Sequence, residues 1–279
     1  MSTCRAVVAL TLAFVVSVSV WTAAGPAQAP TVPGRDAGYD ELLDQYVRDG
    51  LVYYRAIKSV QARLDQYVAS LAAVRVDALP REAQVAFWIN AYNAIVLQTV
   101  ASRYPIAGRS DLYPAGSIRQ IPGAFERTTH QVGGRPLTLD AIEQDMLMPF
   151  GDPRVFLALG RGAIGSGRLR SEAYTAERLE AQLTSIASDC PNRSQCLVVE
   201  PDEGTVSVSS VFSWREDVFV SKYGGEAPPA FASRSPIERA ILGFIQPRLL
   251  GFERAFLEAN QFRMAYIPFD WHLNDLTGR

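Results

Sequence analysis

Residues 81–102 read Arg-Glu-Ala-Gln-Val-Ala-Phe-Trp-Ile-Asn-Ala-Tyr-Asn-Ala-Ile-Val-Leu-Gln-Thr-Val-Ala-Ser. Their apolar side chains, among them Val85, Ile89 and Val96, recur at helical spacing and cover most of the circumference. A helix that is apolar all round is buried. We therefore expect a long helix here, at the centre of the fold.

The remaining pattern places helices and short strands around this helix without a regular βαβ alternation. Helical spacing predicts helices over residues 39–47, 57–74, 138–148, 175–188, 236–246 and 249–259. Extended runs predict strands over 50–54, on both sides of Gly133-Gly134 within 125–137, and over 154–159, 197–200, 205–209 and 263–267. The predicted fold class is α+β, a single mainly helical domain with a short mixed or antiparallel sheet.

The amino end has the layout of a secretory signal. Arg5 precedes an uncharged apolar run over residues 6–24, and several small residues after it offer cleavage points. We predict a cleaved signal peptide over 1–27, a linker over 28–38 and a globular domain over 39–279. The mature protein is then exported, either periplasmic or secreted, and no later segment is apolar enough to cross a membrane.

The charge balance bears on the class of partner. The whole chain carries 27 basic and 29 acidic side chains. Loss of the leader removes one basic residue, which leaves 26 against 29 and a net charge of −3. A mildly acidic domain lacks the basic surface of a nucleic-acid-binding protein. We therefore expect a small molecule or an envelope protein as partner, and no nucleic acid.

Two cysteines remain after the leader, Cys190 and Cys196, and export places them in an oxidising compartment. We predict a disulfide that closes a short loop. A metal site would need two further ligands, and the chain's two histidines are His130 and His272. We predict no metal and no other cofactor.

Two amides, Asn90 and Asn93, lie three positions apart on the predicted buried helix. A buried amide without partners costs about 1 to 3 kcal/mol. The two side chains therefore either clamp the backbone of neighbouring loops or line a ligand pocket. We favour the clamp and keep both residues as ligand-binding candidates.

The loop Gly160-Arg-Gly-Ala-Ile-Gly165 matches the glycine pattern of dinucleotide-binding proteins. That pattern must open a helix directly, whereas the next predicted helix starts near Thr175. We therefore predict no nicotinamide or flavin at this loop.

Several arginines surround the same loop, namely Arg154, Arg161, Arg168 and Arg170. Their guanidinium groups and the loop amides would suit a carboxylate or a phosphate, which makes the first three ligand-binding candidates. The alternative is a solvated basic loop whose arginine stems cover apolar surface.

Ser166, also in this loop, invites comparison with a catalytic nucleophile. The hydrolase elbow needs glycines two positions before and after the serine, which this chain lacks. A base would have to be His130 or His272, and Asp270 lies two residues before the latter. Ser166 and His272 are therefore catalytic candidates, against the alternative of a surface loop and a packed terminal histidine.

Several motifs together resemble the DUF547 family of proteins of unknown function, found in bacteria and plants. The likeness runs in order from about residue 39 to the carboxyl end. Its motifs are Gly50-Leu-Val-Tyr-Tyr54, Ala86-Phe-Trp-Ile-Asn-Ala-Tyr-Asn-Ala94, Leu139-Asp-Ala-Ile-Glu143, Asp152-Pro-Arg-Val155, Phe212-Ser-Trp-Arg-Glu-Asp-Val-Phe219 and Phe269-Asp-Trp-His-Leu-Asn274.

The resemblance implies little about activity, because the family has no assigned function. The family pattern has a His after the Ile-Glu pair, a second His after the Asp-Pro-Arg-Val stretch and a Cys-Pro in the glycine-rich loop. This chain has Gln144, Phe156 and Ser166-Gly167 in those places. Because imidazole and thiolate serve both nucleophilic and metal chemistry, loss of all three indicates a member whose ancestral chemistry has lapsed.

We therefore expect a non-catalytic or altered family member, a pseudoenzyme that binds a small anionic or peptidic ligand. The alternative is an exported hydrolase or transferase in which Ser166 replaces the family's cysteine. A third interpretation is a structural role in the cell envelope.

Overall fold

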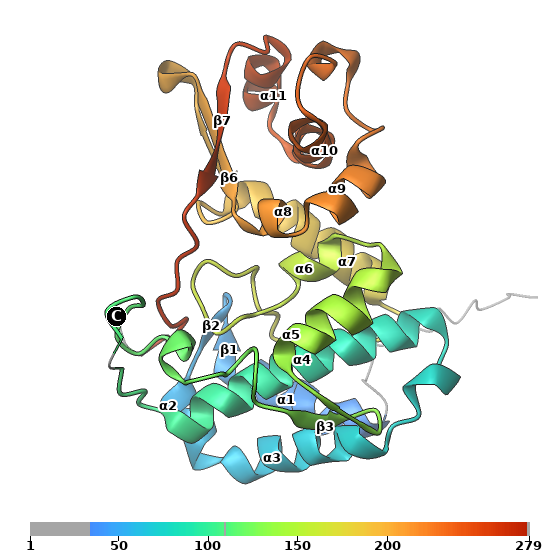
Figure 1. The fold of residues 1–279 in the computed structure, drawn as a ribbon, viewed down its shortest axis with the longest axis vertical. Coiled ribbons are helices and arrows are strands. Elements are labelled where there is room, and N and C mark those ends of the chain that lie inside the picture. Colours follow the sequence, from blue (N-terminus) through green and yellow to red (C-terminus); the bar gives the residue numbers. More distant parts are fainter. Residues whose placement is uncertain (1–33, 109, 278–279) are drawn as a thin grey trace, which may run out of the picture. The chain divides into compact units, whose positions relative to one another are not determined.

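The long helix α4 (Arg81–Arg103) is the buried helix around which the first part of the fold packs (Figure 1). Its residues are buried without interruption from Val85 to Leu97, and helices α2 and α3 pack against it. The prediction of a central buried helix is confirmed. The structure is a computed structural model that describes residues 34–108 and 110–277, so the predicted signal peptide lies outside the described residues.

The described residues form a mainly helical α+β fold, as predicted. Its helices are α1 (Ala37–Tyr46), α2 (Tyr54–Ser59), α3 (Gln61–Ser70), α4, α5 (Leu139–Ala141), α6 (Arg154–Leu157), α7 (Leu179–Asp189), α8 (Val211–Trp214), α9 (Glu216–Tyr223), α10 (Pro236–Ile245) and α11 (Gly251–Glu258). Its strands are β1 (Val47–Arg48), β2 (Leu51–Val52), β3 (His130–Val132), β4 (Arg135–Leu137), β5 (Leu197–Glu200), β6 (Thr205–Ser209) and β7 (Arg263–Ile267).

Two short antiparallel hairpins turn on residue pairs that adopt positive φ. Asp49 and Gly50 join β1 to β2 with φ of 51° and 81°, and Gly133 and Gly134 join β3 to β4 with φ of 60° and 76°. Positive φ at both central residues gives a two-residue turn the twist that antiparallel strands need. Glycine reaches this region without steric cost, and Asp is among the few other residues found there.

The last third of the chain forms a mixed sheet with the order β5-β6-β7. Strands β5 and β6 are antiparallel, and β7 returns parallel to β6. Helices α8 to α11 lie to one side of this sheet (Figure 1). Helix α10 begins with a capping box in which Ser235 accepts from the Glu238 N–H and the Glu238 carboxylate accepts from the Ser235 N–H.

After β7 the chain runs back onto the first part of the fold. The Ile164 N–H donates to the His272 carbonyl at 2.9 Å and the Gly165 N–H donates to the Asp270 carbonyl at 2.8 Å. The Val52 N–H donates to the Asn274 carbonyl, also at 2.9 Å. Residues 270–274 are thereby fixed against both the glycine-rich loop and β2.

The segment Arg154-Val-Phe-Leu-Ala-Leu159 was expected to be a buried strand and instead forms helix α6. It is buried, with Val155, Phe156 and Leu157 in the core, but a short apolar run does not distinguish a strand from a helix. The preceding Asp152-Pro153 favours a turn that leads into a helix, because Oδ1 of Asp152 accepts the Arg154 N–H at 3.0 Å and Pro153 occupies the N-cap position.

The start of helix α7 also differs from the prediction. It was expected to start near Thr175, yet the helix begins at Leu179. The amide of Gln182 explains the delay, since its Oε1 accepts the Thr175 N–H at 3.1 Å and its Nε2 donates to the Ala173 carbonyl at 2.9 Å. These bonds hold the preceding segment outside the helix.

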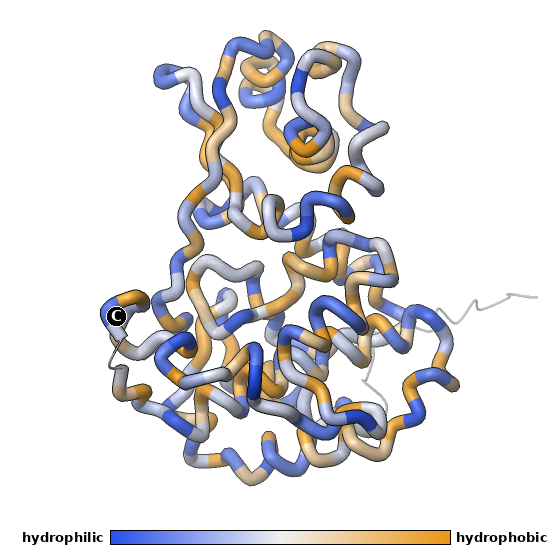
Figure 2. The backbone as a smooth tube through the Cα atoms, viewed as in Figure 1, coloured by the Kyte–Doolittle hydropathy of each residue, from blue (hydrophilic) through white to orange (hydrophobic). Residues whose placement is uncertain are grey.

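Apolar stretches gather along α6 and α10, while the outer loops are mostly hydrophilic (Figure 2). Among the described residues, none of the helices combines the length and apolarity that a membrane span requires.

Candidate functional site

The two asparagines of α4 act as backbone clamps. Asn90 donates to the Tyr174 carbonyl and accepts the Tyr174 N–H, each at 2.9 Å. Asn93 donates to the Ala158 carbonyl at 3.1 Å and accepts the Gly160 N–H at 2.8 Å. The favoured clamp interpretation is confirmed. With their amides engaged in this way, neither residue lines a described cavity, so their ligand-binding role stays a prediction.

The four arginines near the glycine-rich loop do not converge on one anion site. Arg154 pairs with Asp152 and Glu180, both at 2.7 Å, and Arg170 pairs with Glu172. The charges of both guanidinium groups are therefore paired with carboxylates of the protein itself. The other two, Arg161 and Arg168, lie in separate cavities that are described below and in the last subsection.

Two glycines of the glycine-rich loop, Gly165 and Gly167, lie too close to other backbone segments to carry a side chain. A Cβ at Gly167 would collide with the Leu157 carbonyl, and one at Gly165 would lie 2.6 Å from the Asp270 nitrogen. The loop is followed by turns up to α7 and does not open a helix. Gly165 and Gly167 therefore allow the loop to lie in close contact with neighbouring backbone.

Ser166 and His272 have separate partners. The buried Ser166 hydroxyl accepts the Arg161 backbone N–H at 3.0 Å. The His272 side chain is 69% exposed, and its Nδ1 lies 2.7 Å from Oδ1 of Asp270. Among the described residues the Ser166 hydroxyl has no hydrogen bond to an imidazole. Their catalytic pairing stays a prediction that this geometry does not support.

The three departures from the family pattern lie in different surroundings. Gln144 is exposed, whereas Phe156 and Ser166 are buried on either side of Arg161. Arg161 donates through Nη1 to the Phe156 carbonyl at 3.2 Å and through its backbone N–H to Ser166. Two of the three positions therefore meet at one buried arginine.

That arginine leads to a buried ion cluster centred on Glu143. Thr138 caps α5 by accepting the Ala141 N–H at 3.0 Å, and the chain continues into the π-helical turn Ile142–Leu147, which turns the Glu143 carboxylate into the core. Oε1 of Glu143 accepts from Nη2 of Arg161 at 2.5 Å and from Nη2 of Arg215 at 2.6 Å.

The second carboxylate oxygen of Glu143 accepts from the Tyr92 hydroxyl at 3.4 Å. Burial alone would raise the pKa of Glu143, but the charges and N–H groups of Arg161 and Arg215 outweigh burial and hold it below its ordinary value. Burial also raises the pKa of Tyr92, so its hydroxyl remains a donor. Glu143 is therefore ionised at neutral pH.

Aromatic rings enclose this cluster and leave a cavity of about 150 Å³. The Trp214 and Trp271 rings are stacked with centroids 6.4 Å apart, and the Arg119 guanidinium lies 4.6 Å from the centroid of Trp271 and 4.4 Å from that of Phe125. We call this cavity the aromatic–arginine pocket. Its lining residues are Tyr92, Arg119, Phe125, Asp140, Glu143, Arg161, Trp214, Arg215 and Trp271.

Two guanidinium N–H groups of the aromatic–arginine pocket have no acceptor. The Nε atoms of Arg119 and Arg215 are buried and make no hydrogen bond among the described residues. Arg119 also pairs with Glu126, which is half-exposed. Burial, followed by the nearby Glu126 and Glu143, raises the pKa of Asp140. Buried N–H groups without acceptors are costly, which makes the pocket receptive to an anion.

The predicted disulfide is present. Cys190 and Cys196 are joined by an S–S bond of 2.00 Å, and both are buried. Within the part of the chain that the structure describes, no group of three or more His, Cys, Asp or Glu side chains is placed to hold a metal ion.

Comparison with known proteins gives one match. Residues 76–189 match the model of the family described as "Protein of unknown function, DUF547". This segment is similar to DUF547 proteins. No curated protein and no solved structure matches it. The matched DUF547 segment contains α4 and six of the nine residues that line the aromatic–arginine pocket; the other three are Trp214, Arg215 and Trp271.

Sequence reasoning missed this pocket, although Arg161 was among the candidates. Six of its nine lining residues come from four of the motifs that carry the DUF547 resemblance. The motif at 86–94 supplies Tyr92, the motif at 139–143 supplies Asp140 and Glu143, the motif at 212–219 supplies Trp214 and Arg215, and the motif at 269–274 supplies Trp271. A charged side chain at a buried helical position, as at Glu143, was the available signal.

Proposed function

We propose that this protein is an exported ligand-binding protein without catalytic activity, and that its aromatic–arginine pocket binds a small anionic ligand. The observation that carries the proposal is the pair of buried Nε–H groups of Arg119 and Arg215 that have no acceptor among the described residues. An anion placed between them would accept charge-assisted hydrogen bonds, which are stronger than neutral ones.

The walls of the pocket narrow the choice of ligand. Indole faces on Trp214 and Trp271 favour an apolar or planar body beside the charged group. The volume of about 150 Å³ lies below the roughly 300 to 1,000 Å³ of pockets for drug-sized ligands. A small carboxylate, or the acidic end of a larger molecule, therefore fits best.

The departures from the family pattern support a protein without catalytic activity. Phe156 has no group that can transfer a proton or bind a metal, and its ring lies 5.2 Å below the Arg215 guanidinium. The Ser166 oxygen accepts a backbone N–H. Both positions contribute here to holding the ion cluster. The export part of the proposal is supported by the amino-terminal sequence and agrees with the disulfide.

The test is a titration of the purified mature protein with benzoate, followed by tryptophan fluorescence, because Trp214 and Trp271 line the pocket. Benzoate should change the emission saturably, and neutral benzamide should not. Arg215→Gln and Arg119→Gln should each weaken benzoate binding at least tenfold. Arg63→Gln, which alters an exposed ion pair with Glu41, is the matched control.

Circular dichroism checks that each variant is folded. A thermal-shift screen of acetate, succinate, benzoate and inorganic phosphate extends the test to other anions. If none of them binds, or if binding is unchanged in both pocket variants, the proposal is wrong. Turnover of an ester or amide substrate that Ser166→Ala abolishes would establish the hydrolase alternative instead.

A further inference from the structure

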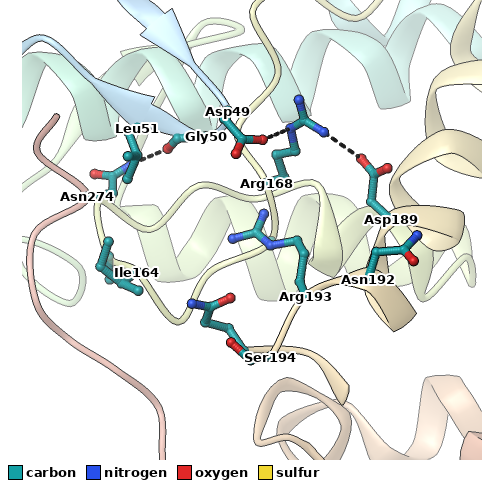
Figure 3. A pocket seen from close by; sticks show the side chains of 13 residues that line it. Asp49, Gly50, Leu51, Ile164, Arg168, Asp189, Asn192, Arg193, Ser194 and Asn274 are labelled. Atoms are coloured by element: carbon teal, nitrogen blue, oxygen red, sulfur yellow. Dashed lines mark hydrogen bonds and ion pairs between the residues drawn. The ribbon is translucent and has the colours of Figure 1, made fainter. Parts of the chain in front are cut away.

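A second cavity, of about 350 Å³, lies apart from the aromatic–arginine pocket (Figure 3). Four segments that are distant in sequence build it: the Asp49-Gly50 turn, the glycine-rich loop up to Arg168, Asp189 with the loop closed by the disulfide Cys190–Cys196, and Asn274 near the carboxyl end. Its walls are mostly polar. We call it the disulfide-loop cavity.

On one side of the disulfide-loop cavity a single cation serves two carboxylates. Nε of Arg168 lies 3.1 Å from Oδ1 of Asp49, and its Nη1 lies 3.6 Å from Oδ2 of Asp189 (Figure 3). Asp49 is 81% exposed on its side chain. Two negative charges against one positive charge leave this side with a net charge of −1.

The opposite charge is on Arg193. Figure 3 shows its guanidinium in the middle of the labelled side chains, with no interaction drawn to it. Its buried Nη1 makes no hydrogen bond among the described residues. Burial lowers the pKa of Arg193; the charges of Asp49 and Asp189 oppose this change, and the charge of Arg168 adds to it. A carboxylate beside Nη1 would supply the missing acceptor through a charge-assisted hydrogen bond.

The backbone around Arg193 is fixed. Its N–H donates to the Cys190 carbonyl at 3.1 Å, and its carbonyl accepts the N–H groups of Cys196 and Leu197 at 2.8 and 3.0 Å. The disulfide closes the same short loop. The guanidinium is therefore presented from a rigid base, which reduces the ordering cost of binding.

We propose that the disulfide-loop cavity binds a small zwitterion of the amino-acid or dipeptide class, with its carboxylate on Arg193 and its ammonium beside Asp49 and Asp189. The net charge of the four side chains is zero, but Asp49 and Asp189 share Arg168, whereas Nη1 of Arg193 has no acceptor among the described residues. A ligand with one charge of each sign can engage both Arg193 and the shared carboxylates, whereas a simple anion or cation engages only one of them. The volume is suited to a ligand of this size.

The probe is glycylglycine, titrated into the mature protein by calorimetry, with two blocked analogues that each lack one charge. N-acetyl-glycylglycine has no ammonium and glycylglycine amide has no carboxylate. We expect saturable binding of glycylglycine and at least tenfold weaker binding of both analogues. Arg193→Gln should weaken glycylglycine binding at least tenfold.

Asp49→Asn is the second variant, and it is expected to fold because Asn tolerates positive φ at this turn. It should weaken glycylglycine several-fold and leave N-acetyl-glycylglycine unchanged. Arg215→Gln, in the aromatic–arginine pocket, should not affect glycylglycine, which separates this proposal from the proposed function. Absence of glycylglycine binding, equal binding of the blocked analogues, or full binding in both variants would overturn it.

Discussion

The Gly160 N–H donates a 2.8 Å hydrogen bond to Oδ1 of Asn93, a residue 67 positions earlier in the chain. Nδ2 of Asn93 donates to the Ala158 carbonyl. One side chain of α4 therefore fixes the point where α6 ends and the glycine-rich loop begins. Asn90 does the same for Tyr174 beyond the loop. The loop that supplies Arg161 and Arg168 to the two cavities is thus held at both ends by α4.

Asn93→Ala should destabilise the protein by about 2 to 6 kcal/mol, because a buried N–H and a buried carbonyl lose their partners at about 1 to 3 kcal/mol each. The measurement is the free energy of unfolding in urea. Gln66→Ala, an exposed change on α3, should stay within about 0.5 kcal/mol of the parent protein. Equal stability of the two variants would contradict the clamp.

Some parts of the fold could be predicted from the sequence, and the two asparagine clamps are among them. Local signals were sufficient for α4 and for the Gly133-Gly134 hairpin, because each depends on neighbouring residues. They failed for α6, since a buried apolar run is compatible with either a helix or a strand. The amide pair was also accessible, because a buried polar side chain on an apolar helix must find a partner.

The candidate site was harder to predict from the sequence, because its residues come from segments that the topology of the chain brings together. Arg161 was recognised as a possible anion ligand, but its partner Glu143 lies 18 positions earlier and Arg215 follows β6. Trp271 reaches the pocket because the chain after β7 returns along the glycine-rich loop. The local spacing of residues does not predict these long-range contacts. Without the contacts, the arginines could not be distinguished from those of a solvated basic loop.

Gly167→Ala should destabilise the protein strongly, since the added Cβ would collide with the Leu157 carbonyl, a backbone atom that cannot rotate away. Overpacking in a tight site costs about 1 to 3 kcal/mol or more. Gly225→Ala is the matched control, because its added Cβ meets nothing within 4 Å and its φ is not positive. Thermal unfolding of both variants checks this, and a Gly167→Ala protein that melts with the control would show that the loop can shift.

Reduction of the Cys190–Cys196 disulfide should lower the free energy of unfolding by about 2 kcal/mol, as the loop-entropy model gives for so short a loop. Urea unfolding with and without a phosphine reductant measures the difference. The double variant Cys190→Ser/Cys196→Ser should match the reduced protein and not respond to reductant. If the reductant also destabilises the double variant, its effect on stability does not come from this disulfide.

The ion cluster at Glu143 should make stability fall in acid. Its pKa in the folded protein is below the ordinary value of 4.5, so the unfolded chain takes up the proton more readily. The stabilisation is therefore complete above about pH 4.5 and is lost as pH falls through the lower folded value. Unfolding free energies measured from pH 7 to pH 3 should show this decline.

Glu143→Gln isolates the contribution of this carboxylate from the other acids of the protein. It should cost about 3 to 5 kcal/mol at pH 7, because Arg161 loses its buried countercharge, and its acid decline should be shallower than that of the parent. Arg215→Gln removes one of the two guanidinium partners and should give an intermediate curve whose decline begins at higher pH. If Glu143→Gln follows the parent curve with the same slope, the carboxylate is not ionised in the folded protein. The aromatic–arginine pocket would then carry more positive charge than its geometry indicates.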